Sequence, residues 1–381
     1  MKHNRKIIYL AGFLFSIPMA LTSYINSSFL ENYLNAYYVS IIYVLASVLT
    51  ILALLEMPRM LTHFGNRKTI LLFSAFIVLA FLGLALGKNA AVIVSAFVLY
   101  FISLNLIFAS LDIFIEDFSE NSSTGSIRGL YLMVINSAWV IAQLISGSII
   151  AKSSFHGIYL FSAGLIILFS AIFVLFLRNF KDPEYRKVPV LKTVKIFIKN
   201  KNISKIYLVS FILKFFFAWM IIYTPIYLHT YMHFGWDQIG IIFSIMLLPF
   251  VILTYPFGKL SDKIGEKKML FVGFLISAFF TLLIPFMAES KLFWWAGILF
   301  MTRVGAATIE VMSESYFFKS IREEDDDEIS FFRNTNALSY IVAPLVAIPI
   351  LMFVPSFKYL FVVLSAILLA GAFLALRLRD V

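Results

Sequence analysis

The sequence predicts an all-α integral membrane protein whose twelve spanning helices form two pseudo-symmetric bundles of six. Three observations point to this fold class. The 381 residues are 61% apolar and only 14% charged, whereas soluble proteins carry roughly 25% charged residues. Long apolar runs recur along the whole chain, and short motifs repeat about 200 residues apart. Lipid is therefore the expected solvent for most of the chain.

The spans follow from the lengths of the apolar runs. A helix needs about 20 apolar residues to cross a hydrocarbon core of roughly 30 Å. Continuous runs favour helices over barrel strands, which alternate apolar and polar residues. The predicted spans are 7–25, 36–55, 70–87, 91–113, 129–151, 156–177, 206–229, 237–256, 269–287, 291–312, 332–354 and 357–376.

Basic residues in the loops orient these spans, because Lys and Arg gather on the cytoplasmic side of a membrane. Of the 31 basic residues, 25 fall on the side of the amino terminus, four on the opposite side, and two inside spans. Both termini are therefore predicted to be cytoplasmic. Abundant Ile, Phe, Lys and Asn indicate a prokaryotic genome, so the expected location is the plasma membrane of a bacterium or archaeon. The net charge of +10 then reflects topology and attraction to anionic lipid headgroups. Nucleic-acid binding is not expected.

Several classes of site are not expected. The chain has no cysteine, which excludes disulfides and thiolate metal sites. His229 and His233 are four residues apart, and we expect interfacial histidines and no metal pair. No P-loop or hydrolase motif is present, so neither an enzyme nor a bound cofactor is predicted. The acidic run at 323–328 is expected to be a solvated loop.

Residues 178–205 are predicted to link an amino-terminal bundle, 1–177, to a carboxyl-terminal bundle, 206–381. This linker carries nine basic residues, and Lys192, Lys195 and Lys199 share one face of a helical pattern. Apolar residues occupy the other face. An amphipathic helix on the cytoplasmic leaflet is the simplest interpretation, and binding of a regulatory partner is the alternative.

Internal repeats align the two halves. Gly65 and Gly265 each lie in a short basic hinge between two spans, and 265 − 65 = 200. Residues 109–118, ASLDIFIEDF, align with 307–316, ATIEVMSESY, where 307 − 109 = 198. This alignment pairs acidic residues at equal depth: Asp112 with Glu310, and Glu116 with Glu314. Matches at similar offsets in corresponding spans indicate a duplicated bundle.

The two halves, the long basic central loop and GKLSDKIGEKK at 258–268 together resemble the Major Facilitator Superfamily. The cytoplasmic signature of that family is a Gly, a loop Asp, a second Gly and then basic residues. The second-half copy matches it with Gly258, Asp262, Gly265, Lys267 and Lys268.

The first-half copy is degenerate. Pro58 and Thr62 replace the first Gly and the Asp, while Gly65, Arg67 and Lys68 remain. The resemblance implies that the signature residues form a cytoplasmic gate.

In this gate Asp262 is expected to act as a latch on the other half, near Arg128. The corresponding latch near Arg333 is expected to be weak, or to use Glu56, because Thr62 forms no ion pair. The alternative is that these charges only set topology and cap helices.

The resemblance also implies secondary transport by alternating access, with spans one, four, seven and ten lining the cavity. Ionisable groups inside spans are costly and usually face such cavities. Lys214 and Arg303 are predicted to bind an anionic or zwitterionic solute, with Asn105 at the position equivalent to Arg303, since 303 − 198 = 105. The residues expected to exchange protons are Glu310, Asp112, Glu314 and Glu116.

Other interpretations of these residues stay open. Lys214 could be neutralised by Glu310 or Glu314 in a purely structural pair, as buried charges usually require. Hydration and capping would explain Asp112 and Glu116. Interhelical hydrogen bonds would explain polar side chains such as Asn105 and Gln143.

The predicted function is therefore secondary active transport of a small organic solute, coupled to protons, by a monomer in the lipid bilayer. A multidrug or cation efflux antiporter is one alternative, although 141–149 lacks the Gly-Pro pattern of many drug antiporters. A lipid flippase or a non-transporting sensor on the same fold is another.

Overall fold

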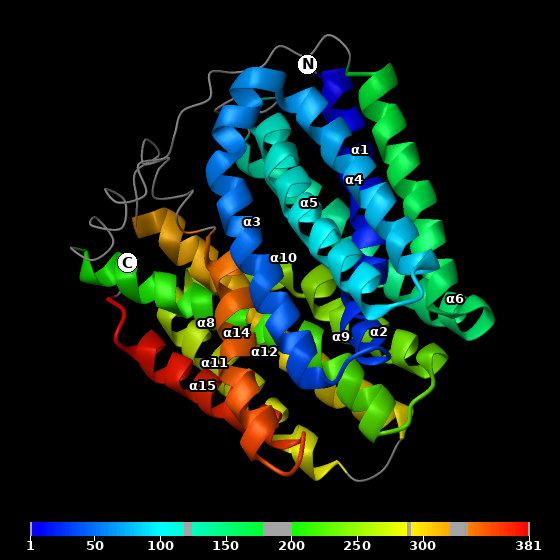
Figure 1. The fold of residues 1–381 in the computed structure, drawn as a ribbon. Helices are drawn as coiled ribbons and strands as arrows, with labels where there is room; N and C mark the ends of the chain where they lie inside the picture. Colours follow the sequence, from blue (N-terminus) through cyan, green and yellow to red (C-terminus); the bar gives the residue numbers. More distant parts are fainter. Residues whose placement is uncertain are drawn as a thin grey trace. The chain divides into compact units, whose positions relative to one another are not determined.

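A computed structural model describes the backbone of residues 2–117, 124–177, 200–287, 291–320, 332 and 334–379. Side chains are described within these ranges except at 2–6, 115–117, 124–133 and 262. Every regular element in the described ranges is helical (Figure 1). The chain divides into two compact units: unit 1 comprises Met1–Lys187 and Gly235–Gly240, and unit 2 comprises Val188–Phe234 and Ile241–Val381.

Unit 1 is a bundle of long helices, drawn from blue to green in Figure 1. Its helices are α1 (Lys2–Ser23), α2 (Asn26–Glu31), α3 (Ala36–Phe64), α4 (Asn66–Leu86), α5 (Ala90–Asp117) and α6 (Thr124–Leu175). Helix α1 packs against α5 and α6, and α4 packs against α5 and α6. Helix α6 is broken at Ser154, where φ is 60° and ψ is −173°, so it supplies two successive spans.

Unit 2 is drawn from green to red. Its elements are α8 (Lys201–Ile226), η1 (Tyr227–Tyr231), most of α9 (Trp236–Ile252), α10 (Thr254–Ile264), α11 (Glu266–Leu283), η2 (Ile284–Phe286), α12 (Leu292–Ser320), α14 (Thr335–Phe353) and α15 (Tyr359–Leu376). Helix α8 packs against α12, α14 and α15, and α11 packs against α12 and α15. The side chain of Asn200 accepts hydrogen bonds from the backbone N–H groups of Asn202 and Ile203, which starts α8.

The number of spans agrees with the sequence prediction. In the described part of the chain, ten helical segments are long and apolar enough to cross a membrane. One of them, Val134–Leu175, contains the break at Ser154 and counts as two spans. Helix α1 adds the shorter apolar segment Ile7–Ser23, which brings the total to the predicted twelve. The all-α membrane fold is confirmed.

The predicted linker falls largely on 178–199, which lie outside the described residues, and so does its predicted amphipathic helix. The last five linker residues, 201–205, form the first turns of α8. Helix α8 therefore begins earlier than the apolar run alone indicates, because a polar side-chain cap fixes the start of a helix independently of hydropathy.

The repeated glycine turn has the same backbone in both units. Gly65 joins α3 to α4 with φ of 79°, and Gly265 joins α10 to α11 with φ of 87°. Only glycine adopts such positive φ values without strain. Each glycine N–H donates to the carbonyl four residues earlier, Leu61 or Ser261, at 2.8 Å. The repeat at an offset of 200 residues therefore includes this hydrogen bond, which both units form.

Candidate functional site

The centre of the candidate site is an ion pair inside unit 2. Lys214 of α8 and Glu310 of α12 lie on helices that pack together. The Lys214 Nζ donates to the Glu310 Oε1 at 2.7 Å, and the two side chains are 23% and 30% exposed. Both groups are therefore paired and still reachable from one side of the helices.

A cleft of about 140 Å³ opens beside this pair, and all its described lining residues belong to unit 2. Its lining residues are Ser210, Leu213, Lys214, Glu310, Ser313, Glu314, Phe332 and Thr335. The α8 members lie on one face, because residues three and four apart are neighbours on a helix. The cleft thus presents one ammonium group, two carboxylates and three hydroxyl groups. Such a lining suits a small polar solute better than an apolar one.

Arg303 lies on α12 two turns before Glu310 and is only 1% exposed. Its Cζ is 4.8 Å from the ring centroid of Phe216 and 5.8 Å from that of Phe217. A cation within about 6 Å of a ring centroid is attracted by the ring face. A buried guanidinium in a membrane span is costly, and these rings of α8 reduce that cost.

The ring of Phe217 lies near two cations. The Lys214 Nζ is 5.3 Å from its ring centroid, and the Arg303 Cζ is 5.8 Å from the same centroid. Phe217 also packs on Phe250 of α9, with 5.7 Å between the ring centroids. The ring therefore connects the buried Arg303 to the ion pair at the cleft. The sequence analysis did not single out Phe216 and Phe217. Their positions two and three residues after Lys214 could have indicated a role beside that cation.

The equivalent positions of unit 1 carry no comparable charge pair among the described side chains. Asn105 donates to the Phe101 carbonyl of its own helix at 2.7 Å. Phe15 occupies the position equivalent to Lys214 in the repeat. It is fully buried and packs on Phe108 and Phe169, each with 5.1 Å between ring centroids. Asp112 is half-buried on α5, and the side chain of Glu116 lies outside the described residues. The structure therefore gathers Lys214, Glu310 and Glu314 at one cleft, while Arg303 lies two turns before Glu310 on α12 and outside the cleft lining.

Polar side chains elsewhere in unit 1 hold helices together. Gln143 of α6 donates to the Ala20 carbonyl of α1 at 2.6 Å. The last four carbonyls of a helix have no partner within that helix, so Gln143 satisfies a group that lipid would leave unpaired. This geometry fits the interhelical interpretation of Gln143.

The two glycines of the second-half signature differ in their structural need. A Cβ added to Gly258, within α10, would meet no atom within 4 Å, whereas Gly265 has positive φ. Pro58, the counterpart of Gly258, lies inside α3. Only the second glycine is required by the turn itself.

The described side chains at the first-half copy of the signature make local contacts within unit 1. Thr62 donates to the Arg59 carbonyl at 2.9 Å, and Glu56 pairs with Arg59 at 2.6 Å on the surface of α3. Arg67 donates to the carbonyls of Phe173 and Val174 at the end of α6, which fits a capping role.

The remaining gate residues are described only in part. Lys68 and Lys268 are exposed, and Lys267 is half-buried. The side chains of Asp262 and Arg128, and all of Arg333, lie outside the described residues. The latch between Asp262 and Arg128 stays a prediction.

Two buried residues that follow the glycines were missed from the sequence. Asn66 donates to the Ser110 carbonyl of α5 at 3.0 Å. Glu266 accepts hydrogen bonds from Ser315 at 2.9 Å and from Lys319 at 2.5 Å, both on α12. Each residue ties the glycine turn to the fourth predicted span of its own half. Their offset, 266 − 66 = 200, could have indicated that they occupy equivalent positions in the two halves.

Metal binding finds no support in the described residues, where no three His, Asp or Glu side chains are placed to hold an ion. The His229 Nδ1 lies 3.0 Å from the Phe234 carbonyl.

Comparisons with known proteins agree with this fold. The model of the Major Facilitator Superfamily matches residues 8–248 and 225–381. No curated protein matches the chain in sequence. An auto-inhibited peptide transporter of the POT family has a similar structure, with a TM-score of 0.78 and 12% identity, covering 100% of this chain and 98% of that one.

Two further solved structures are similar. A POT family transporter in complex with 5-aminolevulinic acid has a TM-score of 0.77 and 13% identity, covering 97% of this chain and 95% of that one. The nucleoside transporter NupG has a TM-score of 0.76 and 13% identity, covering 97% and 98%. Family and fold point to a transporter rather than an enzyme. The chain belongs to the Major Facilitator Superfamily.

Proposed function

We propose that the chain is a proton-linked secondary transporter of a small organic solute that carries a negative charge. The observation that carries this proposal is the Lys214–Glu310 ion pair, 2.7 Å long, at the edge of a cleft inside a membrane-spanning bundle. A structural pair alone needs no cleft, and charges in spans usually mark a solute or proton pathway.

The pair offers a direct route to coupling. When Glu310 is ionised, its carboxylate forms an ion pair with the Lys214 ammonium group. When Glu310 takes up a proton, the pair loses its attraction and Lys214 can bind a carboxylate or phosphate of the solute. Two anions sharing one cation in a medium of low dielectric constant repel each other strongly. Proton and solute therefore bind together, which is the requirement for symport.

Arg303 contributes a fixed positive charge deeper in unit 2. Its guanidinium is held by aromatic rings and does not line the cleft. Its field favours an anion near Lys214, and the field is strong because little water screens it. Glu314, which also lines the cleft, provides a place for the ammonium group of a zwitterion.

Cation export is the second candidate, because two carboxylates, Glu310 and Glu314, line the cleft beside one Lys. A cation binding there would displace Lys214 from Glu310. Arg303 opposes this alternative, since a cationic solute would approach a second buried positive charge.

A transport assay separates these candidates. The full chain is reconstituted in liposomes with a pH gradient and offered organic acids, amino acids, sugars and cationic dyes. We expect gradient-driven uptake of a solute bearing a carboxylate or phosphate, and its loss in Arg303→Ala. Transport of cations that survives Arg303→Ala would favour export of cations and overturn the proposal.

The proposal includes a location. The excess of basic residues on one side of the predicted spans supports a plasma membrane orientation with both termini in the cytoplasm. The Gly65 and Gly265 turns would then face the cytoplasm.

A further inference from the structure

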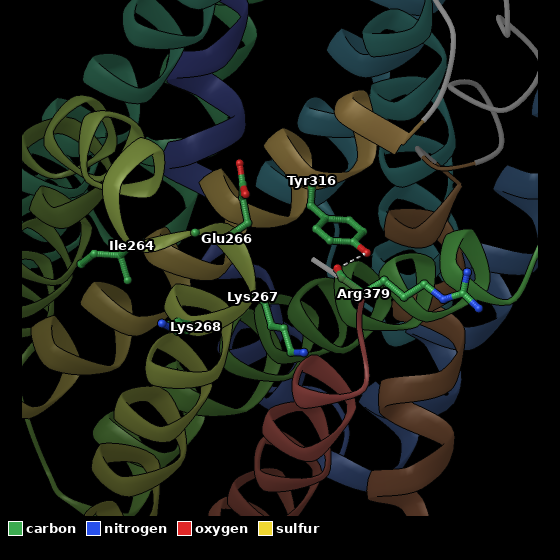
Figure 2. Close-up of a pocket in the computed structure, with 7 residues that line it drawn as sticks. Ile264, Glu266, Lys267, Lys268, Tyr316 and Arg379 are labelled. Carbon is green, nitrogen blue, oxygen red and sulfur yellow. Dashed lines mark hydrogen bonds between the residues drawn. The ribbon is translucent and has the colours of Figure 1, made fainter. Parts of the chain in front are cut away.

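A second cavity, of about 280 Å³, lies at the glycine turn of unit 2 (Figure 2). It is lined by residues 264–268, together with Tyr316 of α12 and Arg379 just after α15. The transport proposal does not use this cavity. We call it the turn pocket.

The lining of the turn pocket is basic. Among the described lining residues, Lys267, Lys268 and Arg379 carry positive charges, and Glu266 carries a carboxylate. That carboxylate is neutralised, because Ser315 and Lys319 both donate to it. Figure 2 shows Glu266 and Lys267 pointing in opposite directions. Among the described lining residues, an anion in the pocket would therefore meet cations and no uncompensated carboxylate.

The backbone adds to this attraction. Helix α11 has 18 residues and begins at Glu266, and the residue before it, Gly265, has no side chain to cap the first N–H groups. The N-terminus of a helix carries a partial positive charge and free N–H donors, both of which favour an anion. The start of helix α11 and the three basic residues all border the same pocket.

The wall formed by Arg379 is held in place. The Tyr316 hydroxyl donates to the Arg379 carbonyl at 2.9 Å, as Figure 2 shows. The Arg379 N–H donates to the Asn202 side chain at 3.3 Å, and Lys205 donates to the Arg377 carbonyl at 2.5 Å. Arg377 and Arg379, which follow α15, are thus tied to α8 and α12.

Unit 1 uses the equivalent position differently. Arg67, the counterpart of Lys267, donates to the carbonyls of Phe173 and Val174 at the end of α6. Its guanidinium therefore caps the sixth span of that half. In unit 2 the shorter, half-buried Lys267 borders an open pocket beside the residues that follow α15, the sixth span there.

The depth of the pocket indicates its occupant. Helix α11 starts there as a membrane-spanning segment, Glu266–Phe286, so the pocket lies where hydrocarbon gives way to headgroups. Ile264, on the rim, is 43% exposed and offers an apolar contact. Basic pockets between spanning helices at this depth suit the headgroups of anionic lipids. We infer that the turn pocket binds a phosphate group, supplied by an anionic lipid or by free phosphate.

Lipid binding to the purified full chain tests this inference and does not require transport. Retention of phosphatidylglycerol and phosphatidylcholine is measured by native mass spectrometry, with the shift in thermal unfolding as a second readout. A third titration uses inorganic phosphate alone, all at about 0.15 M salt because exposed charges are screened. Each basic residue near an anionic surface is worth about fivefold in affinity.

We expect phosphatidylglycerol to bind more tightly than phosphatidylcholine, and Lys267→Gln/Lys268→Gln to weaken it at least tenfold. Arg379→Gln is a second variant, expected to weaken binding about fivefold. Lys263→Gln is the matched control, because Lys263 is exposed in the same hinge and does not line the pocket. Saturable binding of inorganic phosphate with no preference between the lipids would identify free phosphate as the source. Unchanged phosphate and phosphatidylglycerol binding in both pocket variants, or an equal loss in Lys263→Gln, would overturn the inference.

Discussion

Lys214 and Glu310 lie 96 residues apart in the chain, yet their charged groups are 2.7 Å apart. The pair joins α8 to α12, which are separated along the chain by α9, α10 and α11. It borders a cleft and is partly exposed there. A pair of this kind exchanges partners at lower cost than one sealed in a dry core, where separating the charges leaves each unsolvated.

The ring of Phe217 is predicted to tune both cations. Phe217→Leu keeps an apolar side chain but removes the ring face, which at a desolvated site is worth about 1–2 kcal/mol. We expect the apparent affinity for the transported solute to fall by roughly five- to thirtyfold. Uptake kinetics in liposomes measure this. Phe279→Leu is the matched control, since Phe279 is 57% exposed on α11, and an equal loss there would contradict the role of Phe217.

Arg303 is predicted to need its guanidinium as well as its charge. Arg303→Lys keeps a positive charge but loses the planar group that lies over Phe216 and Phe217. We expect Arg303→Lys to retain part of the uptake and Arg303→Ala to lose at least 90% of it. Both variants are compared at equal protein incorporation. Full uptake by Arg303→Ala would show that the buried charge does not act on the solute.

The two signature glycines are predicted to respond in opposite ways to alanine. Gly265→Ala forces a side chain into a conformation with φ of 87° and should cost about 1–3 kcal/mol. Gly258→Ala has free space and a helical backbone, so it should be neutral or stabilise by up to about 1 kcal/mol. Thermal unfolding in detergent distinguishes them. Equal destabilisation by both would argue against the conformational account.

Glu266 is predicted to stabilise the glycine turn of unit 2. Glu266→Ala leaves Ser315 and Lys319 without their common acceptor, and hydrogen bonds to charged groups are worth about 1.5–3 kcal/mol each. We expect a clear fall in the midpoint of thermal unfolding. Glu56→Gln is the control, because its pair with Arg59 is exposed and such pairs contribute about 0–1 kcal/mol. A larger loss in the control would contradict the prediction.

Sequence alone was sufficient for the architecture, for identifiable physical reasons. Lipid leaves backbone groups no partners except within helices, so apolar length locates spans directly. The offset of 200 aligned Gly65 with Gly265, and both turns share the positive φ that glycine permits. The break at Ser154 falls between the fifth and sixth predicted spans, as expected from the apolar runs.

The candidate site could be predicted from the sequence only in part. Hydropathy identifies a charged residue inside a span but does not say which side chains it contacts. Lys214 and Glu310 were marked as ionisable groups in lipid, with pairing as one alternative. The contacts of Phe217 depend on the rotation of α8 against α12, which no local pattern fixes. Glu266 looks like an ordinary loop carboxylate until Ser315 and Lys319 of another helix are placed beside it.

The most direct test of the account is the proton dependence of uptake in liposomes containing the chain or Glu310→Gln. Solute influx is recorded with and without an imposed pH gradient, together with solute exchange at equal pH on both sides. We expect the gradient to accelerate influx through the unaltered chain and not through Glu310→Gln, which should still exchange solute because Lys214 is retained. Glu310→Asp, which keeps a carboxylate, should recover part of the acceleration. Influx through Glu310→Gln that still responds fully to the gradient would contradict the proposed coupling.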